Sequence, residues 1–247
     1  VLLDESHHVQ ARMFREVITK FNPYYLYGLT ATPQRKTNDE KLIFVYLGDI
    51  IYEIPKNYTS VTSEVTSPKT LEIIIRDTNL TIPFNVRNDD FFLLSKILVF
   101  DSERNQLIAN DAAEKARQGY KCLILTERKE HAEALSYYLK RDFEVITLTG
   151  DQSWRKRSDK VRQIHSGHFQ ILIATGQLVG EGADFQNLDC LFLVFPFAFE
   201  GKLIQYIGRI QHGEGTVKLI YDYRDKNVEF LEKLFKKRQR HYNKIRT

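Results

Sequence analysis

Cysteine, methionine and tryptophan are scarce in this chain of 247 residues, which holds two, one and one of them. Cys122 and Cys190 each lie in an apolar run, so we expect two buried, reduced thiols. Two cysteines cannot form a four-cysteine zinc site. No apolar run approaches the roughly 18–20 residues of a bilayer-spanning helix, so we expect no membrane partner.

An initiating methionine and a basic leader are also lacking, because the sequence begins Val1-Leu2-Leu3-Asp4-Glu5. This start is typical of the middle of a β-strand and not of a signal peptide. We therefore expect a portion of a longer protein, located in the cytoplasm or on the nucleoid.

Excess charge is small: 36 Lys and Arg against 32 Asp and Glu give a net charge of +4. Residues 226–247 hold eight basic and two acidic residues, a net of +6, so the other 225 residues stand at −2. The basicity belongs to the C-terminal segment, and the total charge alone predicts no binding groove.

Short apolar runs alternate with amphipathic segments in the second half of the chain. This alternation predicts an α/β fold with a parallel sheet covered by helices on both faces. Ser102 and Gly119 bound a further helix over 101–117. The expected strands are 121–126, 145–148, 171–174, 190–195 and 217–223, and the expected helices are 128–141, 154–165, 203–210 and 227–244.

Residues 42–100 show a less regular pattern, and the polar, Pro-containing segment 82–90 is the candidate domain boundary. We expect an incomplete α/β piece with a linker over 1–85 and a complete α/β domain over 86–225. A basic C-terminal helix over 226–247 follows.

Two acids, Asp4 and Glu5, follow directly on an apolar run. Ligands of parallel sheets bind at the carboxyl ends of strands, where acids can hold a hydrated Mg²⁺ and polarise a water. The same pattern is common at the acidic start of a helix. A metal cluster of Asp4, Glu5, His7 and His8 matches no zinc spacing.

Thr30, Ala31 and Thr32 stand at an apparent strand end 26 to 28 residues after the first acid, which is strand–helix–strand spacing. A strand followed by a simple turn is the alternative. Farther on, the strand at 171–174 leads through Thr175 into a glycine-rich loop with Gly182 and Asp184. Glycines allow close approach to a phosphate, and an acid can accept from a ribose hydroxyl. A flexible loop is the alternative here.

Two further patterns favour phosphate contacts. Gln205, Gly208 and Arg209 share one face of a helix, and Arg is suited to grip a γ-phosphate, although a surface Arg is the alternative. A basic cluster follows Thr149 and could touch a phosphate backbone or be a solvated helix face. Its members are Arg155, Lys156, Arg157, Lys160 and Arg162.

In this order, the segments resemble motifs II to VI of superfamily two helicases and translocases of the DExH type. The resemblance is closest to XPB-like and restriction-type DNA translocases, since motif VI begins with Gln. The matching segments are Asp4-Glu5-Ser6-His7, Thr30-Ala31-Thr32, Leu125-Thr126-Glu127-Arg128, Ala174-Thr175 with Glu181-Gly182-Ala183-Asp184, and Gln205-Tyr206-Ile207-Gly208-Arg209.

The resemblance implies a RecA-like parallel-sheet domain preceded by a partial first RecA-like domain, with ATP and Mg²⁺ as cofactors. Asp4 and Glu5 would hold the metal and act on water, with His7 and Arg209 as further catalytic residues. The remaining roles implied are nucleotide binding by Gly182, Asp184, Gln205, Arg209 and His212, coupling by Thr30, Ala31 and Thr32, and nucleic-acid contact by Thr126, Arg128, Thr149, Arg155, Lys156, Arg157 and Thr175.

The sequence departs from the family pattern at two places. It holds no Gly-x-x-x-x-Gly-Lys-Ser/Thr loop, so we expect this chain alone to bind ATP weakly and not to hydrolyse it. His212 stands where motif VI has a second Arg, and a neutral His offers fewer donors at shorter reach.

The resulting hypothesis is a portion of an ATP-dependent DNA helicase or translocase, with RNA as the alternative strand. The competing hypothesis is a non-catalytic helicase-like module with a degenerate ATP cleft that binds nucleic acid or protein. The expected partners are the missing N-terminal part of the first RecA-like domain and a second copy pairing through an exposed sheet edge.

Overall fold

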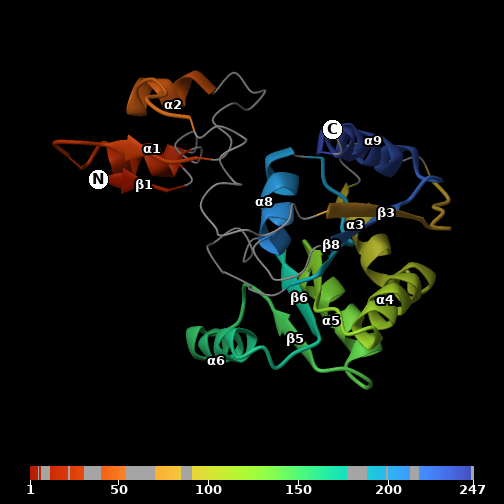
Figure 1. Ribbon diagram of the computed structural model, residues 1–247. Coiled ribbons are helices and arrows are strands. Elements are labelled where there is room, and N and C mark those ends of the chain that lie inside the picture. Colours follow the sequence, from red (N-terminus) through yellow and green to blue (C-terminus); the bar gives the residue numbers. More distant parts are fainter. Residues whose placement is uncertain are drawn as a thin grey trace. The chain divides into compact units, whose positions relative to one another are not determined.

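A computed structural model describes residues 1–4, 6, 12–21, 23–30, 40–53, 70–84, 91–176, 188–198, 200–211 and 217–245 (Figure 1). The chain divides into two compact units, unit 1 over Val1–Val65 and unit 2 over Thr66–Thr247.

Unit 2 is built on a six-stranded sheet in the order β3-β8-β7-β4-β6-β5, and every neighbouring pair is parallel. The predicted α/β fold is therefore confirmed. The strands are β3 (Thr70–Asp77), β4 (Cys122–Thr126), β5 (Val145–Leu148), β6 (Ile171–Thr175), β7 (Cys190–Leu193) and β8 (Val217–Arg224).

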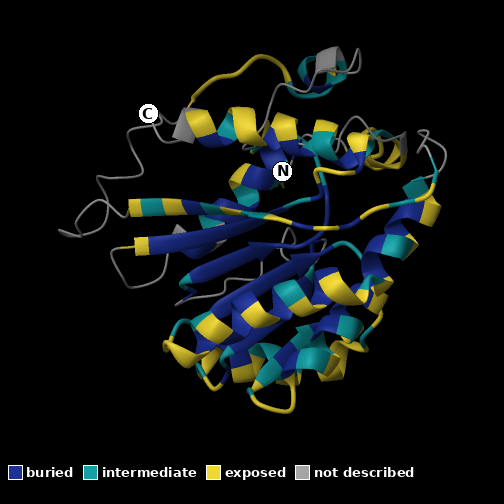
Figure 2. Cartoon of the chain, turned by 90° about the vertical axis from the view of Figure 1, so that its right-hand side faces the viewer, coloured by how far each residue is buried: buried dark blue, intermediate teal, exposed yellow. Residues whose placement is uncertain are grey.

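Helices cover both faces of this sheet, because its central strands are apolar on both sides. Cys122 and Ile124 of β4 pack with α4 (Ser102–Arg117) and α5 (Lys129–Leu139) on one face. Leu123 and Leu125 pack with α6 (Trp154–His165), α8 (Glu200–Gln211) and α9 (Glu229–Ile245) on the other. Figure 2 shows the buried strands between helices whose outer sides are exposed.

The sequence-predicted boundary at 82–90 lies too late in the chain. β3 pairs with β8 from Thr70↔Val217 to Asp77↔Arg224, so it belongs to the sheet of unit 2, and the division falls after Val65. The partner lies more than 140 residues away in sequence, so local composition does not reveal the pairing. The predicted irregular stretch before residue 100 also contains a helix, α3 (Phe91–Phe100), which buries Leu94 and Leu98.

Helix ends follow the predicted chemistry with one shift. The N-cap of α4 is Asp101, whose carboxylate accepts a 2.7 Å hydrogen bond from the Arg104 amide, and not the predicted Ser102. Gly119 and Gly167 follow the C-caps of α4 and α6 with φ of 88° and 73°, the left-handed conformation that glycine favours.

The C-terminal basic segment is an integral part of unit 2. Arg238 of α9 is buried and forms two hydrogen bonds of 2.8 and 2.9 Å to the Asp222 carboxylate on β8. Tyr242 donates to the same carboxylate at 2.7 Å. The predicted basic C-terminal helix is thus present as α9, and one of its cations neutralises a buried acid.

Cys122 and Cys190 are opposite each other on β4 and β7, and both are buried free thiols, as predicted. The hydrogen bond between the two thiols and their burial raise the pKa of Cys122 far above its usual value. Cys122 therefore does not have the character of a reactive thiolate.

Unit 1 contains a two-stranded parallel sheet, β1 (Leu2–Leu3) with β2 (Tyr27–Gly28), and the helices α1 (Arg12–Ile18) and α2 (Glu40–Leu47). A side chain at Gly28 would overlap Ser6 and Leu47, so the close packing there requires glycine. Several large apolar side chains are exposed, including Met13, Tyr24 and Ile51. Within the described parts of both units, no helix has the length and apolarity needed to span a membrane.

Candidate functional site

The carboxyl ends of three neighbouring strands of unit 2 carry the predicted nucleic-acid residues. Thr126 of β4 and Thr175 of β6 are register partners, and Thr149 follows β5, which pairs with β6. Arg128 lies two residues after β4. The fold therefore gathers residues from distant motifs at one edge of the sheet, where ligands of parallel sheets bind.

Thr126 is buried beneath this edge and hydrogen-bonds to the core. Its side chain is 1% exposed, and its hydroxyl is 2.9 Å from Nδ1 of the buried His131, whose Nε2 is 3.0 Å from the Asn105 carbonyl oxygen. An amide oxygen only accepts, so Nε2 carries the proton and Thr126 donates to Nδ1. The geometry gives Thr126 a positioning role and does not support its predicted contact with a nucleic-acid strand.

Burial, with a smaller contribution from Arg104, lowers the pKa of His131 to about 3. The imidazole is therefore neutral at physiological pH, consistent with this hydrogen-bonding pattern.

Arg128 extends along the partly exposed side of the same edge. Its Nη2 donates to Ser95 Oγ of α3 at 3.2 Å, and its guanidinium lies 6.0 Å from the ring centroid of Phe92. Thr126 Oγ1 also accepts from the Arg128 amide at 3.3 Å. The β4–α5 turn is thus fixed to α3, which keeps a cation at the carboxyl edge.

Thr149 is 4% exposed and donates to Asp151 at 2.6 Å, so its hydroxyl serves the turn after β5. Lys129 forms an ion pair of 2.5 Å with Asp151 and so connects the turns after β4 and β5. The hydrogen bonds from Lys129 and Thr149 lower the pKa of Asp151 to about 2. Asp151 therefore stays ionised and holds Lys129 at the edge.

The basic cluster lies at the start of α6, directly after this turn. Trp154 is 82% exposed, and Arg155 and Lys156 are exposed beside it. Lys160 instead donates to the carbonyl oxygen of Thr147 at 2.5 Å, and burial lowers its pKa. The exposed members can meet a phosphate backbone, whereas Lys160 supports the helix.

The motif VI helix, α8, is fixed to the ends of β4 and β6. Tyr206 donates to Glu127 at 2.9 Å, and Lys202 pairs with the same carboxylate at 2.8 Å. A side chain at Gly176 would overlap both Tyr206 and Glu127. Gly176, directly after Thr175 of the motif V segment, therefore lets the motif IV and motif VI segments meet, and Gln205 lies on this anchored helix.

The other predicted nucleotide contacts of unit 2 fall largely outside the described residues. Arg209 belongs to α8, but its side chain is outside that description. Gly182, Asp184 and His212 lie outside the described residues altogether.

In unit 1, the predicted motif II and motif III segments lie side by side. The parallel pairing Leu3↔Gly28 puts Asp4 and Thr30 just beyond the carboxyl ends of β1 and β2, and the Ser6 amide donates to Leu29 at 2.8 Å. Glu5, His7, Ala31 and Thr32 lie outside the described residues.

A single exposed carboxylate at a strand end suits Mg²⁺, which keeps several waters and takes only one or two protein carboxylates. Over the described ranges, no three His, Cys, Asp or Glu side chains converge on a common metal position. Asp4 therefore has the chemistry and position of a ligand to a hydrated magnesium ion.

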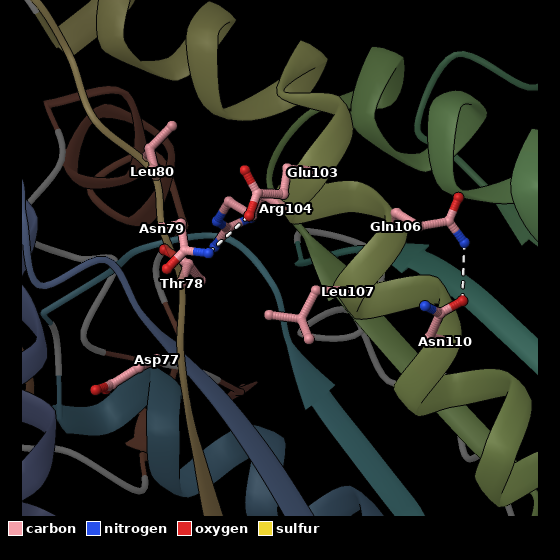
Figure 3. A pocket seen from close by; sticks show the side chains of 9 residues that line it. All are labelled: Asp77, Thr78, Asn79, Leu80, Glu103, Arg104, Gln106, Leu107 and Asn110. Carbon is pink, nitrogen blue, oxygen red and sulfur yellow. Dashed lines mark hydrogen bonds between the residues drawn. The ribbon is translucent and has the colours of Figure 1, made fainter.

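A pocket of about 400 Å³ lies between the segment after β3 and the start of α4 (Figure 3). Four of its polar side chains pair with one another: Asn79 donates to Glu103 at 2.7 Å and Gln106 to Asn110 at 2.8 Å. Arg104 is tied to the buried Asp225 at 2.9 Å. The pocket contains none of the predicted site residues.

A parallel sheet with helices on both faces and a polar carboxyl edge defines a doubly wound α/β domain, and solved helicase structures of RecA-like fold share this architecture. Residues 102–213 match the family model described as helicase conserved C-terminal domain. Residues 1–35 match the model described as type III restriction enzyme, res subunit.

The chain is 26% identical over 225 residues to putative helicase 22 of Sulfolobus islandicus filamentous virus, covering 85% of this chain and 39% of that protein. It is 29% identical to transcript termination protein A18 of vaccinia virus, covering 85% and 43%. The fowlpox virus A18 protein is 26% identical, with 94% and 51% covered. The chain therefore spans about two fifths to one half of these relatives.

Solved structures with the same fold include S. cerevisiae Dbp5 L327V bound to RNA and ADP BeF3, with a TM-score of 0.60 and 16% identity. That match covers 96% of this chain and 57% of the other. T4 UvsW matches with a TM-score of 0.52 and 17% identity, covering 98% and 51%. The chain is therefore similar to DExH-type superfamily two helicases and translocases, and its residues 102–213 match their C-terminal domain.

Sequence reasoning missed the residues that hold the site together. Glu127 and Tyr206 lie inside the recognised motifs, but their mutual contact joins segments 79 residues apart. His131 stands on the buried face of α5, where its spacing matches core residues. Phe92 lay in a stretch read as irregular, and only its exposure and cationic neighbours distinguish it.

Proposed function

We propose that this chain forms part of a nucleic-acid-dependent ATPase that couples ATP hydrolysis by two RecA-like domains to movement along a DNA strand. The observation that carries the proposal is the gathering of Arg128, Thr175 and the exposed start of α6 at one carboxyl edge of unit 2. The anchored motif VI helix lies beside the same edge.

For the nucleotide, we assign Asp4 to bind Mg²⁺ through water and Glu5 to polarise the attacking water. When bound, the magnesium ion would neutralise phosphate charge. Gln205, Arg209 and Asp184 are assigned to the nucleotide from unit 2, and Thr30 to the coupling segment. The support is the strand-end position of Asp4 and Thr30 and the location of Gln205 and Arg209 on α8.

For nucleic acid, the support comes from the cations of the edge and from the relatives. One relative is named a putative helicase, and one structure of the same fold is described as bound to RNA and ADP BeF3. We propose DNA as the bound strand, and the experiment compares it with RNA. Backbone phosphates supply the main, salt-dependent attraction for such surfaces.

The decisive experiment measures ATP hydrolysis by the longer parent protein with and without single-stranded DNA or RNA. DNA should stimulate hydrolysis, and Glu5→Gln should reduce the stimulated rate by about 10²–10⁴-fold, the usual contribution of a general base. Glu130→Gln, an exposed acid on α5, is the matched control and should leave the rate unchanged. Hydrolysis that ignores nucleic acid, or that survives Glu5→Gln, would contradict the proposal.

The purified 247-residue chain should show no nucleic-acid-stimulated ATPase, since its sequence holds no phosphate-binding loop. Measurable turnover by this chain would contradict that expectation.

A non-catalytic helicase-like module remains the second candidate, favoured by His212 in place of the second Arg of motif VI. His212→Arg in the parent protein separates the two. If position 212 is the arginine-finger position, turnover should rise, because such an Arg is worth about 10³–10⁵ in rate. A parent with no turnover in either form, yet with nucleic-acid binding, would favour the module.

A further inference from the structure

An exposed aromatic ring lies beside the carboxyl edge of unit 2, outside every recognised motif. Phe92, in the first turn of α3, is 61% exposed although phenylalanine is normally buried. The ammonium of Lys96 lies 4.6 Å from its ring centroid, and the guanidinium of Arg128 lies 6.0 Å from it. The ring is thus exposed and has two cations within about 6 Å of its centroid.

Buried contacts fix this ring to the candidate site. Ser95, one turn after Phe92, is 2% exposed, donates to the Phe92 carbonyl oxygen at 2.7 Å and accepts from Arg128 at 3.2 Å. Leu94 and Leu98 anchor the opposite side of α3 in the core. Phe92 is therefore held in a defined position next to the β4–α5 turn.

Cations continue from this ring along the edge. Arg128 is followed by Lys129, whose ion pair with Asp151 reaches the turn after β5. Beyond that turn stand the exposed Trp154, Arg155 and Lys156. The edge thus carries an aromatic ring near each end with basic groups between, which is the composition of surfaces that bind single-stranded nucleic acid.

The free energies of a cation–π contact and of base stacking indicate which partner the Phe92 ring would prefer. A cation–π contact at an exposed site is worth about 0.5–1 kcal/mol. Stacking of a base on an aromatic side chain is worth about 1–3 kcal/mol. A base should therefore displace the flexible Lys96 ammonium from the ring, and the freed ammonium gains a phosphate partner.

We propose that Phe92 is a stacking platform for a base of single-stranded nucleic acid, with Lys96 and Arg128 binding the adjacent phosphates. This inference rests on the proposed nucleic-acid binding and adds a base contact made by α3. Stacking is tolerant of sequence, because every base has a π-face, so the site suits a protein that moves along a strand.

The test compares two fluorescent single strands of equal length and charge, both of about 15 nucleotides, the upper range of single-strand site sizes. One is oligo-dT and the other is abasic, and anisotropy titrations measure their affinities for the 247-residue chain. The chain should bind oligo-dT more tightly. Phe92→Ala should weaken oligo-dT binding by about 5–150-fold, the equivalent of one lost stack, and leave abasic binding within about twofold.

Three further variants keep the result interpretable. Phe92→Leu retains apolar volume but lacks the π-face and should lose the same preference, whereas Phe92→Tyr should retain it. Phe100→Ala removes another exposed ring, 66% exposed at the far end of the same helix, and should change neither affinity. Thermal melts confirm that the variants fold.

Equal affinity of the unaltered chain for both strands would overturn the stacking proposal and leave nucleic-acid binding intact. An unchanged preference in Phe92→Leu would overturn it as well. Failure to bind either strand would overturn both this inference and the proposed function of the edge.

Discussion

Buried ion pairs connect the outer elements of unit 2 to its sheet. Arg238 is the clearest case: both its Nε and Nη2 donate to Asp222, and its Nη1 donates to the Phe197 carbonyl oxygen at 2.6 Å. Burial alone would lower the pKa of Arg238, but the Asp222 carboxylate raises it above its usual value. The guanidinium is therefore charged, and it forms a buried ion pair that joins α9 to β8.

Arg238→Ala should lower the free energy of unfolding by about 3–5 kcal/mol, because it leaves the Asp222 carboxylate buried without its cation. Urea denaturation followed by circular dichroism measures the change. Arg240→Ala, an exposed arginine on the same helix, is the matched control and should shift stability by less than about 0.5 kcal/mol. Equal, small shifts in the two variants would show that the ion pair contributes nothing.

His131 predicts a dependence of stability on pH. Its folded pKa of about 3 lies below the unfolded value of about 6.5, so the unfolded chain binds the proton first. Stability from this group is present above pH 6.5 and falls as pH decreases, by up to about 1.4 kcal/mol per pH unit. Urea unfolding from pH 7 to pH 5 measures this slope.

His131→Gln removes the titrating group and serves as the comparison. Its unfolding free energy should be lower at pH 7, because the Thr126 and Asn105 contacts are disturbed, but its decline towards pH 5 should be shallower. Parallel declines in the two proteins would contradict a neutral, buried His131.

At the scale of elements, α6 and α8 differ in how far they are buried at the carboxyl edge. α8 is anchored to the end of β4, because its Tyr206 and Lys202 both contact the Glu127 carboxylate. α6 buries only Ile164 among its twelve residues and exposes its basic first turn, so it is available to a ligand. This difference in burial decides which helix offers side chains to nucleic acid.

Replacing Arg155 and Lys156 by Gln should weaken DNA binding uniformly across sequences and reduce the salt slope by about 1 for each cation. Anisotropy titrations over a range of salt concentrations measure the slope. The replacement of Lys237 and Arg240, which are exposed on α9, by Gln is the control and should leave the slope unchanged. If the α9 pair changed the slope more, the C-terminal helix would be the main electrostatic contact.

Deleting residues 236–247 is not a test of charge alone. The deletion removes Arg238 and Tyr242, both of which contact Asp222 in the core. If the deleted chain lost nucleic-acid binding equally at low and high salt, the loss would indicate unfolding of unit 2 and not the removal of charge.

For the whole molecule, the two units differ in how well they bury apolar side chains. Unit 2 has continuous cores on both faces of its sheet. Unit 1 exposes Met13, Tyr24, Val45, Ile51 and Tyr52 among its described residues. Exposed apolar surface of this kind favours association.

The 247-residue chain should therefore self-associate in a concentration-dependent way, whereas residues 66–247 should stay monomeric. Light scattering coupled to size-exclusion chromatography measures both masses. A 247-residue chain that stays monomeric at about 100 μM, where a dissociation constant in the micromolar range would give mostly dimer, would contradict the prediction.

The sequence alone determined the elements of the second half and their parallel arrangement. Continuously apolar runs such as Ile171–Ala174 bury in a sheet whatever surrounds them, and Gly119 and Gly167 end their helices through local backbone preference. Ordered motifs likewise indicated the family and the residues that meet at the carboxyl edge, because parallel strands must bring their carboxyl ends together.

Only the tertiary structure decided which strands pair and which side chains are buried or exposed. It paired β3 with β8, tied the Thr126 and Thr149 hydroxyls to His131 and Asp151, and turned Arg238 inward while leaving Phe92 exposed. Each of these outcomes depends on a partner distant in sequence or on burial. Neither quantity is contained in residue type or local spacing.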